Sequence, residues 1–122
     1  MVQFQHSILI FHGSSSLESQ KTINKFIESI KSQSKLSFSV CYLKESSPTL
    51  SDALTNALNE GKTEITCFPL FLLPGSHVLK DIPKIVEDFK HEHPECNIKL
   101  LPCLAEKASF VDYTIKVLEN NK

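Results

Sequence analysis

The feature that most constrains this fold is an alternation of strand-like and helix-like segments, which repeats four times in 122 residues. Short apolar or alternating runs at 7–11, 36–43, 64–73 and 97–101 have the pattern of β-strands. Each is followed by apolar residues at helical spacing, within 15–32, 48–60, 81–93 and 104–118. Strands separated by helices of this length form right-handed units and a parallel sheet. The sequence therefore predicts a single α/β domain, residues 1–122, with three layers.

The expected strand order is 2-1-3-4, as in flavodoxin-like folds, with helices on both faces of the four-stranded sheet. In that order the strands at 7–11 and 64–73 are neighbours, and the segments that follow them diverge to opposite faces. Open α/β sheets bind ligands in the crevice outside the carboxyl ends of such strands. We therefore look for functional residues directly after these two strands.

Local signals predict where the helices begin and where one strand ends. Ser15 and Glu18 have the spacing of a capping box for the first helix. The dipeptide Ser47-Pro48 predicts an N-cap and a first-turn proline for the second helix. Asp81 to Pro83 predicts the start of the third helix in the same way. Pro69 predicts that the third strand ends early or bends there.

Charge and composition exclude several classes of partner. The net charge is -1, so the chain has no overall basic field for nucleic acid. All the basic residues are lysines, so an anion must be held by lysine, hydroxyl groups or backbone N–H groups instead of arginine forks. No apolar run approaches the roughly 20 residues of a membrane span, and the first residues lack the features of a signal peptide. We expect a cytoplasmic protein with no membrane partner.

The four cysteines do not have the spacing of a metal site. No C-x-x-C pair occurs, so a four-cysteine metal centre or cluster is not expected. Two of them stand in strand-like runs, where cysteine commonly serves as a small core residue. These are Cys41 and Cys67; the others are Cys96 and Cys103.

Two histidines follow the two strands that border the predicted crevice. His12 follows the first strand in "FHGSSS", and His77 follows the third in "PGSHVLKDIP". Two facing imidazoles can share cobalt, nickel, iron or zinc, and they can accept protons near neutral pH. Gly13 and Gly75 permit close approach of the backbone to a ligand. On the residues alone, two ordinary loop histidines beside tight turns remain an alternative.

The other three histidines are weaker candidates. His6 precedes the first strand at the opposite end of the sheet, where a structural or solvated role is expected. His91 and His93 stand near the end of the third helix, where they complement the helix dipole.

The stretches "ILIFHGSSS" (8–16) and "PLFLLPGSHVLKDIP" (69–83) resemble the small class II chelatases of the sirohydrochlorin cobaltochelatase type. The resemblance extends from about residue 7 to 118. It implies a lyase that inserts a divalent metal into the tetrapyrrole sirohydrochlorin without ATP. His12 and His77 would be both the metal-binding and the catalytic pair. The resemblance also implies a homodimer of half-size chains that encloses the substrate.

The resemblance and the chemistry of a substrate with many carboxylates suggest further binding residues. The metal is a substrate, with Co²⁺ favoured and Fe²⁺ or Ni²⁺ as alternatives, and no organic cofactor is expected. The pathway would be the synthesis of cobalamin or siroheme. The candidate substrate-binding residues are Gly13, Ser14, Ser15, Lys44, Gly75, Ser76 and Lys80.

The chain departs from the family pattern at two positions. Ser15 stands where the family often has arginine. Lys44 stands where the family usually has glutamate, and Glu45 follows one place later.

Other functions have less support from the sequence. A histidine phosphatase would need an arginine beside the first-strand histidine, where Phe11 stands. Neither the Gly-x-Ser-x-Gly of an α/β-hydrolase nor a glycine-rich nucleotide loop is present. A carrier that binds metal or tetrapyrrole without catalysis remains the non-enzyme alternative.

Overall fold

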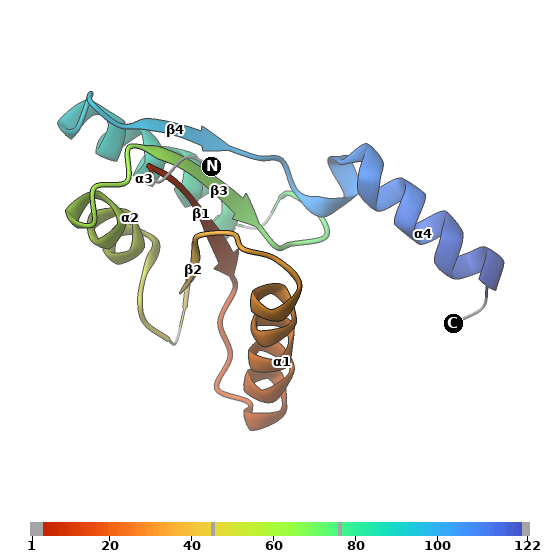
Figure 1. The fold of residues 1–122 in the computed structure, drawn as a ribbon. Helices are drawn as coiled ribbons and strands as arrows, with labels where there is room; N and C mark the ends of the chain where they lie inside the picture. The colour runs from red at the N-terminus through yellow and green to blue at the C-terminus, as the bar shows by residue number, and fades with distance from the viewer. Residues whose placement is uncertain (1–3, 45, 76, 121–122) are drawn as a thin grey trace.

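The computed structural model describes residues 4–44, 46–75 and 77–120, and for residues 77–79 it describes the backbone alone. Four parallel strands form one sheet in the order β2-β1-β3-β4, which confirms the predicted order (Figure 1). The strands are β1 (Gln5–Phe11), β2 (Phe38–Tyr42), β3 (Glu64–Pro69) and β4 (Asn97–Leu100). The helices are α1 (Leu17–Gln33), α2 (Leu50–Asn59), α3 (His77–Glu92), the short 3₁₀ helix η1 (Leu104–Glu106) and α4 (Ala108–Asn120).

One face of the sheet carries the main core, beneath α2 and α3. Alternate residues of each strand point to this face, as the period of two in a β-strand requires. Ile8 and Ile10 of β1 are fully buried there, beside Cys41 and Cys67. Leu54 of α2 is also fully buried in this cluster. This face therefore supplies most of the apolar burial that holds the domain together.

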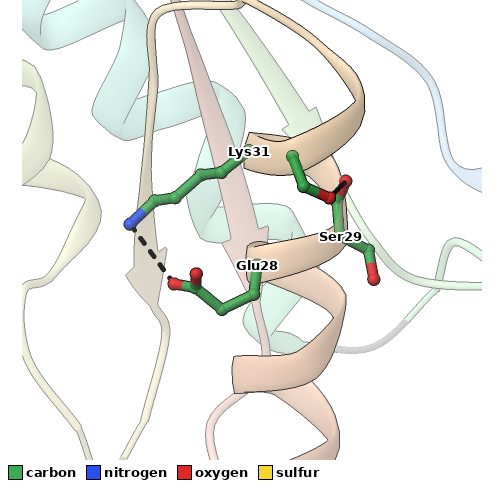
Figure 2. Close-up of polar contacts among 4 residues, drawn as sticks. Glu28, Ser29 and Lys31 are labelled. Atoms are coloured by element: carbon green, nitrogen blue, oxygen red, sulfur yellow. Dashed lines mark hydrogen bonds and ion pairs between the residues drawn. The ribbon is translucent and has the colours of Figure 1, made fainter.

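The opposite face of the sheet is covered by α1 and is less completely buried. Phe11 of β1 packs edge-on against Phe26 of α1, with ring centroids 6.4 Å apart, and stacks on Tyr42 of β2 at 6.0 Å. None of the α1 side chains, all of which the structure describes, is fully buried. The outward side of α1 is polar, and Figure 2 shows the ion pair between Lys31 and Glu28 at 3.7 Å. Helix α1 therefore covers this face of the sheet only in part.

Helix α4 stands away from the sheet (Figure 1). The segment predicted as a single helix at 104–118 is divided by Lys107 into η1 and α4. No α4 side chain, all of them described, is buried. Helix α4 therefore does not pack beside α1 on this face of the sheet.

The predicted start of α1 is wrong by one residue, and that of α2 by two. The N-cap of α1 is Ser16, whose hydroxyl accepts a hydrogen bond from Ser19 N, and not Ser15. The N-cap of α2 is Thr49, and not Ser47. Thr49 accepts from Asp52 N while Asp52 accepts from Thr49 N, so this capping box satisfies two backbone donors at once.

The third helix differs more from its prediction. It begins at His77, so Pro83 lies inside α3 and Asp81 is not its N-cap. A proline interior to a helix removes one backbone hydrogen bond, which is why the sequence favoured a later start. Pro69 is the last residue of β3, as predicted. Among the helices in the described ranges, none has both the length and the apolar character needed to cross a bilayer.

Candidate functional site

His12 lies at the carboxyl edge of the two central strands. The backbone N–H of Leu70 donates to the carbonyl of Ile10 at 2.9 Å, so the segments that leave β1 and β3 start side by side. The imidazole of His12 meets the ring of Phe71 edge-on, with centroids 6.1 Å apart. The fold thus brings His12 beside the segment that leads to His77.

The imidazole of His12 is exposed and has one polar neighbour of defined chemistry. Its Nδ1 lies 3.4 Å from the carbonyl oxygen of Gly13. Because a carbonyl oxygen can only accept, this contact favours the tautomer with the proton on Nδ1. Nε2 then keeps its lone pair, which is the form of imidazole that binds a metal or takes up a proton.

Gly13 allows the loop that carries His12 to pack closely against the loop after β2. Its φ is +103°, and a Cβ at this position would overlap the carbonyl oxygen of Lys44. Lys44 N in turn donates to the carbonyl of His12 at 2.9 Å. The glycine is therefore required by close approach of the protein's own backbone, whereas Gly75, at φ +118°, has open space around it.

A cleft of about 510 Å³ opens beside His12. It lies between the loop after β1, the first two turns of α1 and the residue that follows β3. Its lining consists of Phe11, His12, Gly13, Ser14, Glu18, Ser19, Thr22, Ile23 and Leu70.

Ser14 has a structural role in this lining. Its hydroxyl accepts a hydrogen bond from Ser16 N at 3.0 Å, and its carbonyl accepts from Gln20 Nε2 at 2.9 Å. The hydroxyl hydrogen of Ser14 remains able to donate to a ligand in the cleft. Ser15 is the next residue and is exposed.

The remaining predicted site residues fall into two groups. Lys44 and Lys80 are exposed, the first beside the His12 loop and the second in the first turn of α3. Ser76 lies outside the described residues, and so does the side chain of His77, whose backbone begins α3. The pairing of the two imidazoles therefore stays a prediction.

Sequence reasoning missed two features of this site. Glu18 was interpreted as a capping residue, but it lines the cleft. Its position together with Ser19 and Thr22, at helical spacing directly after His12, could have indicated a helix face turned toward the cleft. Phe71, which contacts His12, was interpreted only as part of an apolar run.

His6 is structural. It is buried, with Nδ1 2.7 Å from Ser37 Oγ and Nε2 2.9 Å from Ser39 Oγ. Burial lowers the pKa of His6, and the positive charge of Lys62 lowers it further.

The buried cysteines are core residues, as predicted. Burial raises the pKa of Cys41 and of Cys67 to about 12, so both remain protonated thiols at neutral pH. Among the described residues, no three side chains of the types His, Cys, Asp or Glu gather as a metal-binding group.

Comparison with known proteins identifies the family. A family model named CbiX matches residues 6–121. The chain belongs to the CbiX family.

Curated relatives of this CbiX chain carry two different names. It is 28% identical over 99 residues to a sirohydrochlorin ferrochelatase of Priestia megaterium, a match that covers 80% of this chain and 37% of the relative. It is 35% identical over 79 residues to a sirohydrochlorin cobaltochelatase of Saccharolobus solfataricus, a match that covers 65% of this chain and 61% of the relative. The CbiX chain thus spans less than two thirds of the length of these relatives.

Solved structures include one of similar length. A protein of Marinobacter aquaeolei, named as a candidate CbiX protein of cobalamin (vitamin B12) biosynthesis, superposes with a TM-score of 0.78 at 26% identity. The superposition covers 98% of this chain and 95% of the other.

Proposed function

We propose that this chain is a sirohydrochlorin chelatase, which inserts a divalent metal ion into the tetrapyrrole without ATP. The observation that carries the proposal is the exposed His12 imidazole at the edge of a cleft of about 510 Å³ in a CbiX-family chain. Relatives named for the insertion of cobalt and of iron support the same reaction class.

The reaction exchanges one metal ion for two protons. As M²⁺ forms bonds to the ring nitrogens, the two pyrrole N–H groups lose their protons, so charge balances without a redox step. His12 acts first as a metal ligand that holds the ion beside the ring, and His77 is its proposed partner. Once an imidazole releases the metal, it can accept a departing proton. Because neutral imidazole is the ligand, acid should inhibit the reaction.

The substrate carboxylates need donors around the cleft. Lys44 and Lys80 are the proposed cations, since both are exposed near the carboxyl edge of the sheet. Ser14, Ser15 and Ser76 supply hydroxyl groups in this proposal. Gly13 and Gly75 shape the loops that carry the histidines.

We favour Co²⁺ as the metal, which would place the reaction in cobalamin synthesis, in a cytoplasmic protein. Fe²⁺, for siroheme, and Ni²⁺ are the alternatives, because imidazole binds all three ions. A competition experiment decides among them: sirohydrochlorin is mixed with equimolar Co²⁺, Fe²⁺ and Ni²⁺ without oxygen, and the products are separated by their absorbance. Cobalt insertion should exceed that of the other two.

Variants of the histidines test the site. His12→Ala and His77→Ala should each lower the insertion rate by about 100-fold or more, since each removes a metal ligand. His91→Ala, an exposed histidine in the last turn of α3, is the matched control and should keep the full rate. Full activity in both site variants would refute the assignment. If the protein binds sirohydrochlorin but never exceeds the spontaneous insertion rate, it is a carrier.

A further inference from the structure

The imidazole of His12 has little hydrogen bonding to hold it in one orientation. The ring is exposed, and its Nδ1 lies 3.4 Å from the carbonyl oxygen of Gly13, which is a long contact to the neighbouring residue. Among the residues that the structure describes, no other polar group is hydrogen-bonded to this ring. An exposed histidine side chain has about three χ1 rotamers, each with about two ring orientations, and exchanges among them within nanoseconds. A contact of another kind is therefore needed to keep the imidazole in one orientation.

Phe71 supplies such a contact. Its ring meets the imidazole of His12 edge-on, with centroids 6.1 Å apart and an angle of 84° between the ring planes. This perpendicular arrangement is one of the preferred geometries of two aromatic rings, because the positive edge of one faces the negative face of the other. Rotation of His12 about its side-chain bonds would weaken this attraction. Phe71 therefore favours a single orientation of the imidazole.

Phe71 can orient another ring because its own position is fixed. Its side chain is partly buried and packs against the apolar core. Its carbonyl oxygen accepts a hydrogen bond from Leu104 N at 2.9 Å, which ties the residue to η1. On its N-terminal side, Leu70 N donates to the carbonyl of Ile10, also at 2.9 Å. The backbone on both sides of the ring is thus anchored to neighbouring segments.

We propose that Phe71 is a positioning residue, which keeps the imidazole of His12 in the orientation that binds the metal. In this proposal Phe71 acts through His12 and makes no contact with the metal itself. Its consequence for catalysis rests on the proposed chelatase function, whereas the orienting contact is a property of the metal-free chain. The two can therefore be tested separately.

The size of the effect follows from the number of orientations. Without the ring of Phe71, the imidazole of His12 would spend about one sixth of its time in the orientation that binds the metal, since about six are accessible. A site that is competent for only a fraction of the time binds its ligand more weakly by the same factor. The KM for the metal should then rise by roughly 6-fold in Phe71→Leu. The KM for sirohydrochlorin should not change, because Phe71 does not line the cleft.

Phe89 provides a matched control. It is also a partly buried phenylalanine that packs against the core, and its ring lies beside a histidine, with 4.5 Å between its centroid and that of His93. Neither of these two residues lines the cleft of His12. Phe89→Leu should therefore lower stability in a similar way and leave both KM values unchanged. A substitution that only destabilises the fold reduces the amount of active protein, which lowers the apparent kcat but not the KM for the metal.

The first experiment observes His12 in the metal-free chain by NMR. The native protein should show nuclear Overhauser effects between the ring protons of His12 and Phe71, and three-bond couplings of His12 that correspond to one χ1 rotamer. In Phe71→Leu these couplings should move to values averaged over several rotamers, while those of His93 stay unchanged. Phe71→Tyr keeps the ring and should keep the native couplings. Averaged couplings in the native chain, or a single His12 rotamer in Phe71→Leu, would overturn the proposal.

The second experiment measures the insertion of Co²⁺ into sirohydrochlorin over a range of metal concentrations. Phe71→Leu should have a KM for Co²⁺ that is raised by roughly 6-fold, whereas Phe71→Tyr and Phe89→Leu should keep the native value. An unchanged KM in a folded Phe71→Leu protein whose imidazole has lost its orientation would refute the positioning role. If the native chain inserts no metal, the proposed function fails instead, and the NMR couplings with equilibrium binding of Co²⁺ decide the role of Phe71.

Discussion

Replacing Gly13 tests whether the loop that carries His12 is held by the backbone of Lys44. Gly13→Ala adds one methyl group at φ +103°, where it overlaps the Lys44 carbonyl oxygen. Gly61 is the matched control, because its φ is +82° and nothing lies within 4 Å of an added Cβ. The two substitutions therefore share the cost of a positive φ and differ in the overlap.

The expected magnitudes follow from these two contributions. A positive φ costs a residue with a side chain about 1–2 kcal/mol, so Gly61→Ala should lower the free energy of unfolding by about that amount. The overlap at Gly13 is with a backbone atom, which cannot rotate away, and such overpacking adds roughly 1–3 kcal/mol. Gly13→Ala should therefore destabilise the domain by about 2–5 kcal/mol.

Urea unfolding measures the two free energies, and metal insertion into sirohydrochlorin measures the consequence for the site. In Gly13→Ala the hydrogen bond from Lys44 N to His12 O should be lost, and the insertion rate should fall by roughly 100-fold as the imidazole moves. Gly61→Ala should keep its rate. If both variants lose the same stability to within about 0.5 kcal/mol, the close approach to Lys44 does not constrain this loop.

Three further predictions concern buried and capping groups. Because the pKa of His6 is lowered in the folded state, the unfolded chain binds more protons below about pH 6.5, and stability should fall as the pH falls through this value. His6→Gln should flatten that dependence in urea unfolding at a series of pH values. Cys41 and Cys67, with pKa raised to about 12, should resist iodoacetamide until the chain unfolds, as mass spectrometry can show. Thr49→Ala should cost about 1 kcal/mol in the same unfolding assay, since it removes the α2 cap.

The strand order could be predicted from the sequence because it follows from strong regularities. The alternation of strands and helices, with right-handed connections, leaves few topologies for four units. The position of His12 at the carboxyl edge follows from that topology alone. Because β1 and β3 are parallel neighbours, the loops that follow them lie at the same edge of the sheet, and this does not depend on how the side chains pack.

The helix starts were predicted less well because competing signals lie close together. Ser14, Ser15 and Ser16 are all possible N-caps, and the turn in which Ser14 accepts from Ser16 N selects the last of them. Pro83 suggested a late start for α3, but proline preferences are local and were overridden here. Glu18 was not placed in the cleft because its capping-box spacing was given more weight than the α1 face that it shares with Ser19 and Thr22.

The position of α4 was beyond the sequence for a different physical reason. The spacing of Val111, Ile115 and Leu118 predicts an apolar side on this helix. It does not specify which surface packs against that side. In this chain the choice depends on the junction at η1, because backbone hydrogen bonds to Phe71 and Leu72 orient the helix outward. Those bonds join segments about 30 residues apart, and no local pattern encodes them. The loop after β3, which leads to His77, also anchors η1, so one segment both leads to a proposed metal ligand and sets the direction of the last helix.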